Sequence, residues 1–107
     1  MKQCDEMGPT YDLEDIRKLI LQEKFFVTLT AVEGAASLGL DDGDIRDCVT
    51  KQMNETHFYK TMPAERAPGL WQDVYKIRYA GHRLYIKVQV NAAGRAVIVS
   101  FKQDTSE

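Results

Sequence analysis

The chain has 107 residues, of which 44% are hydrophobic and 28% are charged, and its formal net charge is −2. This length and composition predict one globular domain over residues 1–107. The sequence contains no apolar run as long as a membrane span and no signal-peptide pattern, so we expect a cytoplasmic protein with no membrane partner.

Cysteine and histidine usage gives no sign of a metal centre. The two cysteines and two histidines lack the spacing of a zinc site, so no metal and no cofactor are expected. Cys4 lies in a segment, 1–9, that has no hydrophobic periodicity and is expected to be mobile. Cys48 lies in a predicted helix. Because cytosolic thiols stay reduced, both are expected to be free.

The first half of the chain predicts three helices. Asp12 is a candidate N-cap for a helix that runs to about residue 24. Residues 25–27 form either a brief edge strand or an extended connection, after which Thr28 or Thr30 can cap a short second helix. Asp41 begins a third helix, whose dipole favours the negative charges near its start. The apolar positions of this third helix are Ile45, Cys48, Val49 and Met53.

The second half predicts an antiparallel β-sheet. Apolar and polar residues alternate with the two-residue period of a strand, and Ala80-Gly81 and residues 92–95 provide turns between strands. With the helices expected on one face of this sheet, the predicted fold class is α+β. The strands are expected at 58–62, 70–79, 83–91 and 96–102.

The hydrophobic pattern predicts the register of the last hairpin, because a slip of one residue would mix its two faces. In the last strand, Val97, Val99 and Phe101 are expected to face the core and Ile98 to face away from it. The expected pairs are Asn91 with Ala96, Val88 with Val99, Lys87 with Ser100, Ile86 with Phe101 and Tyr85 with Lys102.

The preceding hairpin adds cations to the outer face of the sheet. Pairing Tyr79 with His82 puts Lys76 opposite Tyr85. Asp73 is the exception, because alternation turns it inward; it is either hydrogen-bonded near the sheet edge or a sign that the register differs there. The residues expected on the outer face are Gln72, Lys76, Arg78, Tyr85, Lys87 and Lys102.

Charge is distributed unevenly along the chain. Residues 1–57 contain 6 Lys and Arg against 12 Asp and Glu, for a charge of −6. Residues 58–102 contain 8 against 2, for +6, and the tail contributes −2 through Asp104 and Glu107. A basic sheet on an acidic helical half favours a polyanion as the partner of the sheet.

A cationic cluster with a tyrosine and a glutamine suits phosphodiester chemistry. Lysine and arginine can hold a phosphate and stabilise the negative charge that develops on it, and a tyrosine beside cations is expected to have a lowered pKa. RNA carries its own nucleophile in the 2′-hydroxyl, so cleavage needs neither a metal nor an enzyme nucleophile. The competing interpretation is an ordinary solvated sheet face, which is commonly polar.

Several motifs resemble those of the MqsR toxins, the motility quorum-sensing regulator family of bacterial toxin–antitoxin systems. The resemblance covers most of the chain, and the block Trp71-Gln72-Asp73-Val74-Tyr75-Lys76 is its most specific part. The other matching segments are Leu38-Gly39-Leu40-Asp41, Phe58-Tyr59-Lys60-Thr61-Met62, Tyr85-Ile86-Lys87 and Val99-Ser100-Phe101-Lys102.

The resemblance implies a RelE-like fold and a ribosome-independent, sequence-selective mRNA endonuclease. It implies active-site positions at Lys60, Gln72, Tyr85 and Lys102, with Met62 and Lys76 close by. Lys60 rests on the resemblance alone. The position of Lys76 is often arginine in the family, and lysine keeps the charge there but lacks the planar fork that binds phosphate. Arg78 and Lys87 are added as RNA-binding residues because of their charge and face.

The resemblance also implies partners. The expected antitoxin is of the MqsA type, a zinc-binding protein with a helix-turn-helix domain, with which the toxin would repress their operon; operator DNA would be bound only through the antitoxin. Two other functions remain open from the residues. The basic sheet could belong to a non-catalytic RNA- or ribosome-binding module, or it could dock an acidic protein.

Overall fold

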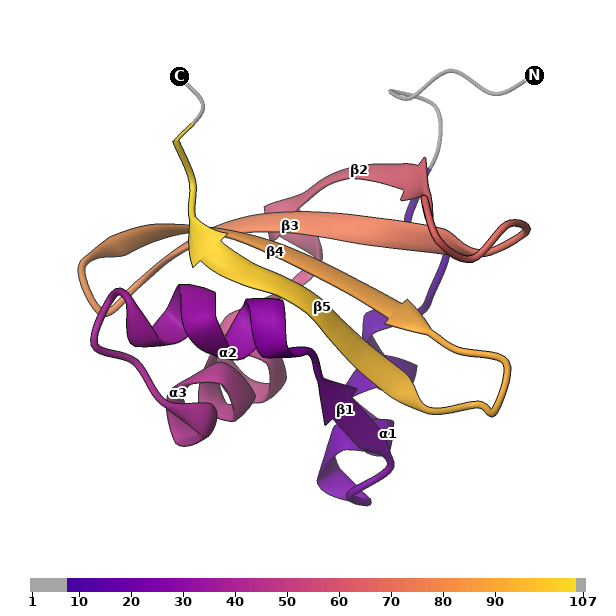
Figure 1. Cartoon of the computed structure of the whole chain (residues 1–107), viewed down its shortest axis with the longest axis horizontal. Coiled ribbons are helices and arrows are strands. Elements are labelled where there is room, and N and C mark those ends of the chain that lie inside the picture. Colours follow the sequence, from indigo (N-terminus) through magenta and orange to yellow (C-terminus); the bar gives the residue numbers. More distant parts are fainter. Residues whose placement is uncertain (1–7, 106–107) are drawn as a thin grey trace.

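The computed structural model describes residues 8–105 and contains three α-helices and five strands (Figure 1). The helices are α1 (Leu13–Leu21), α2 (Leu29–Ala36) and α3 (Asp42–Asp47), and α3 continues into a π-helical turn (Cys48–Gln52) and a 3₁₀ turn (Glu55–His57). The strands are β1 (Phe25–Val27), β2 (Phe58–Pro63), β3 (Trp71–Tyr79), β4 (His82–Val90) and β5 (Ala96–Gln103). The α+β class is therefore confirmed.

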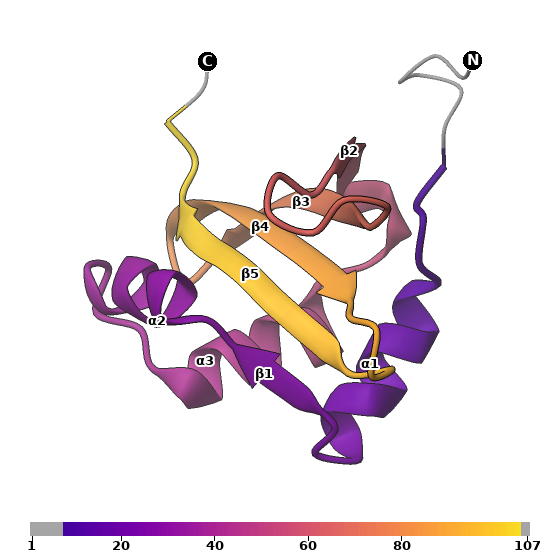
Figure 2. The same ribbon diagram turned by 45° about the vertical axis from the view of Figure 1, so that its right-hand side comes forward.

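The five strands form one sheet in the order β1-β5-β4-β3-β2. The pairs from β2 to β5 are antiparallel, as expected. The short β1 lies at the edge beside β5 and runs parallel to it (Figure 2). The antiparallel pairing predicted for the second half of the chain is thus confirmed. The 25–27 segment, which the sequence left open between an edge strand and an extended connection, adds a parallel edge strand that makes the sheet mixed.

Side-chain caps begin all three helices. The carboxylate of Asp12 accepts a hydrogen bond from Glu14 N and begins α1. Thr28, and not Thr30, caps α2 by accepting from Ala31 N (3.1 Å). Asp41 caps α3, where its side chain and that of Asp44 each accept from the other's backbone N–H in a capping box. These bonds satisfy amides that a helix leaves without partners in its first turn.

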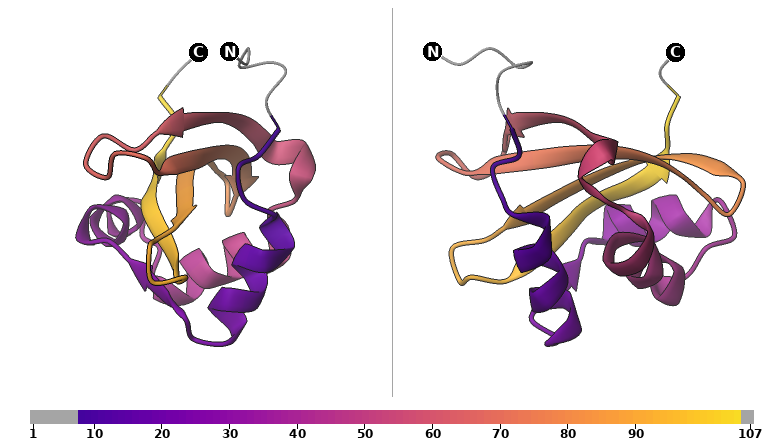
Figure 3. Two further views of the ribbon diagram at one scale, coloured as in Figure 1. Left: turned by 90° about the vertical axis from the view of Figure 1, so that its right-hand side faces the viewer. Right: turned by 180° about the vertical axis from the view of Figure 1, so that it is seen from behind.

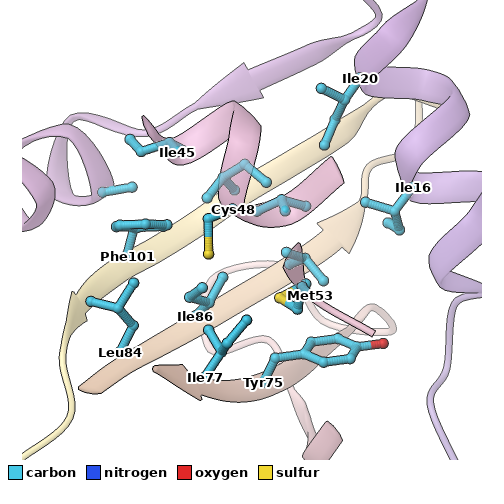
Figure 4. Close-up of a cluster of buried hydrophobic side chains, with 14 of the residues drawn as sticks. Ile16, Ile20, Ile45, Cys48, Met53, Tyr75, Ile77, Leu84, Ile86 and Phe101 are labelled. Carbon is cyan, nitrogen blue, oxygen red and sulfur yellow. The ribbon is translucent and has the colours of Figure 1, made fainter. Parts of the chain in front are cut away.

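The helices and the sheet share one hydrophobic core. Figure 3 shows α1, α2 and α3 on the same side of the sheet. Buried side chains of the helices, such as Ile16 and Ile45, belong to the same cluster as Leu84 and Phe101 of the sheet (Figure 4). The other face of the sheet is therefore left without a helical layer. None of the helices described over residues 8–105 is long and apolar enough to span a membrane.

Cys48 lies inside this core. It is fully buried, it is a free thiol, and burial raises its pKa to about 12. The free state expected of Cys48 is confirmed. The expectations for Cys4, and for mobility of the segment over residues 1–7, lie outside the described residues.

The register of the β4–β5 hairpin differs from the prediction in the half that is nearer the turn. The pairs Tyr85–Lys102, Ile86–Phe101 and Lys87–Ser100 are confirmed. Nearer the turn, Val88 pairs with Ile98, and Val90 pairs with Ala96. The expected pairs of Val88 with Val99 and of Asn91 with Ala96 are therefore wrong.

A β-bulge explains the difference. The register shifts by one residue between Lys87 and Val88, and Val99 is the extra residue of β5. Ile98 is consequently buried in the core, whereas Val97 and Val99 are half-buried. The Thr28 hydroxyl donates to Val99 O (2.8 Å), and Thr28 N donates to Ile98 O. The cap of α2 thus supplies partners to the strand where the regular ladder is interrupted.

Asp73 is buried and hydrogen-bonded, which confirms the first of the two explanations considered for it. It pairs with Val88 of β4, as the predicted register requires. Its carboxylate accepts from Thr10 N and Tyr11 N, both at 2.9 Å. These bonds compensate for burial of the charge and attach the segment before α1 to β3.

Gly34 brings α2 into close contact with β5. A Cβ atom at this position would lie 2.3 Å from Phe101 O and 3.2 Å from Lys102 Cβ. Backbone would have to move to admit it. We expect Gly34→Ala to lower the free energy of unfolding by about 1–3 kcal/mol, as overpacking does, in spite of the better helix propensity of alanine. Urea unfolding would measure this loss.

Gly43→Ala is the matched control, because Gly43 is also helical and its Cβ would meet only the Asp41 side chain, at 3.3 Å. It should change the stability less. Equal stability of Gly34→Ala and wild type would contradict the close approach of α2 to β5.

Candidate functional site

The sheet face opposite the helices carries a cluster that we call the cationic face. Its members come from four neighbouring strands, β2 to β5. The strand pairs and the burial of the residues next to them place these side chains away from the core. Strands that are hydrogen-bonded side by side hold their side chains at a fixed spacing, so this surface is preformed. The cationic face consists of Tyr59, Lys60, Lys76, Tyr85, Lys87 and Lys102.

Tyr85 lies at the centre of this face, between two lysines. It pairs with Lys76 on one side and with Lys102 on the other. Since neighbouring strands are about 4.8 Å apart, the two lysine backbones are separated by about 10 Å. The Nζ atom of Lys102 is 5.4 Å from the centroid of the Tyr85 ring, and that of Lys87 is 6.0 Å from it. Tyr85 and Lys102 are therefore placed together, as alternation predicted.

Tyr59 joins Lys60 and Lys76 to the cluster. The Nζ atom of Lys76 lies 3.9 Å from the centroid of the Tyr59 ring, which is a close cation–π contact, and that of Lys60 lies 5.6 Å from it. The register of β2 shifts between Phe58 and Lys60. This irregularity explains why Tyr59 shares the face of Lys60, although simple alternation would separate them.

A second row of residues crosses the sheet next to Tyr85. Lys60 pairs with Val74, Val74 with Lys87, and Lys87 with Ser100. Val74 is fully buried even though it is on the outer face, so neighbouring side chains of this face cover it. Lys60 and Lys87 are half-buried, which limits the positions that their ammonium groups can reach.

Gln72 and Met62 lie one row further from Tyr85. Met62 pairs with Gln72, whose Nε2 donates to Gln89 Oε1 (3.0 Å). This amide pair orients Gln72 on the outer face. Arg78 lies beyond Lys76 in the opposite direction, where it pairs with Arg83. The predicted site residues thus share one face but form a strip along it, with Tyr85 in the middle.

Asp104 introduces a carboxylate at the edge of the cluster. Its Oδ2 lies 3.5 Å from Lys76 Nζ, its side chain is only 5% exposed, and its backbone N–H donates to Arg83 O (2.7 Å). It also lines a hollow of about 110 Å³ beside Tyr85 and Lys102. Lys76 is thereby fixed between the Asp104 carboxylate and the Tyr59 ring.

The pKa of Tyr85 is raised, and not lowered as expected from the neighbouring cations. Burial of the phenol is the main cause, followed by the charges of Tyr59 and Asp104. Both effects disfavour the phenolate. Tyr85 therefore remains a neutral hydrogen-bond donor to a higher pH than a free tyrosine.

We expect Asp104→Asn to lower the pKa of Tyr85, because the substitution removes a negative charge that opposes ionisation. Ultraviolet absorbance of the phenolate, followed against pH, would measure the pKa. Subtracting the titration of the corresponding Tyr85→Phe protein from that of the wild type, and likewise for Asp104→Asn, isolates Tyr85 from the other tyrosines. Asp15→Asn, an exposed change on α1, is the control and should leave the titration unchanged. A Tyr85 titration at the wild-type pH in Asp104→Asn would contradict the expectation.

Four residues near the cluster were missed by sequence reasoning as candidates. Asp104 is two residues after Lys102, so continued alternation could have placed it on the same face. Alternation along β4 also places Gln89 and Arg83 on the outer face. Polar side chains of these types are common on a solvated sheet face, so nothing in the sequence marks them as site residues. Tyr59 depends on the irregularity in β2, for which the sequence holds no clear signal. Within residues 8–105, no group of three or more His, Cys, Asp and Glu side chains is placed to hold a metal ion.

Comparison with known proteins shows the family of the chain. Residues 8–103 match the family described as "Motility quorum-sensing regulator, toxin of MqsA". The mRNA interferase toxin MqsR of Escherichia coli (strain K12) is 32% identical over 99 residues, which cover 92% of this chain and 98% of that protein. The match includes all four strands that form the cationic face. The chain therefore belongs to the motility quorum-sensing regulator family of toxins.

Proposed function

We propose that this chain is the toxin of a type II toxin–antitoxin system and that it acts as an endoribonuclease on mRNA. The observation that carries the proposal is the row in which Tyr85 lies between Lys76 and Lys102 on a face without helices. A polyanion can approach this face and contact several cations at once. The name of the E. coli relative, an mRNA interferase toxin, supports mRNA as the substrate class.

The proposed reaction uses the 2′-hydroxyl of the RNA as nucleophile. This hydroxyl loses its proton and its oxygen attacks the adjacent phosphorus, while the bond from phosphorus to the 5′-oxygen breaks and that oxygen takes up a proton. The products are a 2′,3′-cyclic phosphate and a 5′-hydroxyl. Lys60 and Lys102 would stabilise the extra negative charge on the pentavalent phosphate, and one of them would exchange protons.

Other residues would bind and orient the substrate. Lys76, Lys87 and Arg78 would attract the RNA backbone, and Met62 would contact the substrate at the far end of the strip. Gln72 would donate a hydrogen bond to a phosphate or a base, since its amide is already oriented by Gln89. Tyr85 has two possible roles, namely deprotonating the 2′-hydroxyl and positioning the phosphate. Its raised pKa favours the second.

The proposal extends to regulation and to the fold. A cognate antitoxin of the MqsA type, zinc-binding and with a helix-turn-helix domain, would neutralise the toxin and repress the operon together with it. The family description names MqsA as the counterpart of these toxins, which supports this partner. We further propose a single domain over 1–107, a RelE-like fold, a cytoplasmic location and sequence-selective cleavage that does not need the ribosome.

Incubation of the purified protein with a defined mRNA in EDTA tests the proposal. We expect cleavage without added metal and, on mapping, ends that carry a 2′,3′-cyclic phosphate and a 5′-hydroxyl. An RNA with one 2′-deoxynucleotide at the mapped cut is the matched control and should stay intact at that position, because the nucleophile is absent.

A Tyr85→Phe protein purified in parallel controls for contaminating nucleases. Binding of RNA without cleavage would contradict the proposal and favour an RNA- or ribosome-binding module. A partner bound in high salt and without RNA would favour a protein-docking function, because contacts with phosphates weaken steeply with salt.

A further inference from the structure

A second cationic hollow lies next to the Tyr85 row, toward the turn between β3 and β4. Its volume is about 380 Å³. Two of its lining residues, Lys76 and Arg78, already have a proposed role in attracting the RNA backbone, whereas His57 and Arg83 have none. Lys76 is common to this hollow and to the cationic face, so the two are continuous. The polar residues that line the hollow are His57, Lys76, Arg78, Arg83 and Asp104.

Two arginines on neighbouring strands line this hollow. Arg78 of β3 pairs directly with Arg83 of β4, and both side chains are exposed. None of the four ion pairs in the part of the chain that the structure describes involves either of them. Like charges directly opposite on neighbouring strands are destabilising, and arginine cannot lose its charge. An anion between the two groups would relieve this repulsion.

The chemistry of the arginines indicates which anion fits. A guanidinium presents its N–H groups as a planar fork that matches the oxygens of a phosphate. His57 adds a further donor to the wall. The backbone N–H of Asn54 donates to His57 Nδ1 (3.0 Å), so the proton of the neutral ring lies on Nε2.

The carboxylate in the hollow does not oppose this assignment. The side chain of Asp104 is 5% exposed and is paired with Lys76 at 3.5 Å. Its negative charge is therefore largely compensated and covered. By holding Lys76 it also keeps an ammonium group in the wall that the hollow shares with the cationic face.

We propose that this hollow is a second phosphate subsite, which binds the RNA phosphate next to the one that is cleaved. Arg78 is two residues from Lys76 along β3, a distance of about 6.6 Å at 3.3 Å per residue. This step is comparable with the separation of neighbouring phosphates in an extended ribonucleotide chain. The inference rests on the proposed function, and it assigns Arg83 and His57 to substrate binding.

Cleavage of RNA oligonucleotides of increasing length tests the subsite. A minimal substrate carries only the nucleotides on either side of the mapped cut, and two series extend it toward the 5′ or the 3′ end. Extension in one direction should raise the kcat/KM of the wild type. Arg83→Gln should reduce that gain by about 10- to 100-fold, the usual effect of one hydrogen bond to a charged group, and leave the minimal substrate unchanged.

Lys51→Gln is the matched control, because it removes one positive charge on the helical side and should leave the gain intact. The inference is overturned if Arg83→Gln slows the minimal and extended substrates by the same factor or not at all. It is also overturned if extension in neither direction improves cleavage by the wild type. The thermal stability of Arg83→Gln should be no lower than that of the wild type, since the side chain is exposed and the substitution removes its repulsion with Arg78.

Binding measurements separate failure of the subsite from failure of the nuclease proposal. The probe is a short single-stranded oligonucleotide with 2′-deoxynucleotides throughout, which this reaction cannot cleave and which requires no mapped cut. The slope of log K against log[salt] should be smaller by about 0.7 in Arg83→Gln, as for one lost phosphate contact on a single strand, and unchanged in Lys51→Gln. A protein that cleaves no RNA but shows this change retains the subsite, whereas an unchanged slope rejects it.

Discussion

Replacing Tyr85 with phenylalanine should slow RNA cleavage by about 10²- to 10³-fold, the range found when one preorganised hydrogen-bond donor to a developing negative charge is removed. The substitution removes only the phenolic oxygen and keeps the ring that lies beside Lys102 and Lys87. The phosphate would lose its central hydrogen-bond donor but keep the surrounding cations. Single-turnover cleavage of a defined RNA measures the loss, and the affinity for an uncleavable RNA should change much less.

Tyr79→Phe is the matched control for this prediction. The Tyr79 hydroxyl bonds Asp47 (3.0 Å) and Asp44 (3.3 Å) of α3, on the helical side of the same hairpin. Its loss should affect stability by about 1 kcal/mol and leave the cleavage rate unaltered. If Tyr85→Phe cleaved RNA as fast as wild type, Tyr85 would have no part in the chemistry.

Replacing Lys102 with alanine should lower kcat by about 10²- to 10³-fold, as does the removal of one preorganised group that stabilises charge in a transition state. Lys102 is exposed, so the protein should fold normally without it. Its ammonium group lies beside Tyr85, where charge would develop on the phosphate during attack. Steady-state kinetics with a short RNA would separate kcat from KM.

Lys51→Ala, which removes an exposed lysine on the opposite side of the molecule, is the control and should retain full activity. The double variant Tyr85→Phe/Lys102→Ala should be less impaired than the product of the two single effects, because both groups would act on one phosphate. A rise in KM alone for Lys102→Ala would instead assign Lys102 to orienting the backbone.

The centre of the candidate site could be predicted from the sequence because β4 alternates without interruption. Leu84, Ile86 and Val88 all face the core, so Tyr85 and Lys87 must face outward. The turn at Gly81 then determined which residues of β3 lie beside them. In this part of the sheet, local pattern and tertiary structure impose the same arrangement.

The remainder depended on interactions between segments that are distant in the chain. Where the β-bulge interrupts the ladder near Val99, the hydrogen-bond partners of β5 come from Thr28, and alternation within β5 cannot reveal them. The direction of the Tyr85 pKa shift depends on how deeply the ring is buried, which a charge pattern does not report. Asp73 could be recognised as an exception, but its partners, Thr10 and Tyr11, lie in a segment without periodicity.

The extra residue in β5 separates two functions of this strand. The residues of β5 before Val99 pair with β1 and follow the turn, and this pairing determines which of them face the core. The residues after Val99 pair with β4 around Tyr85, and that pairing determines which of them join the cationic face. A change in the length of the turn at 91–95 could therefore be absorbed upstream of Ser100 without rotating Lys102 to the wrong side. Relatives with turns of different length could thus present the same lysine beside the same tyrosine.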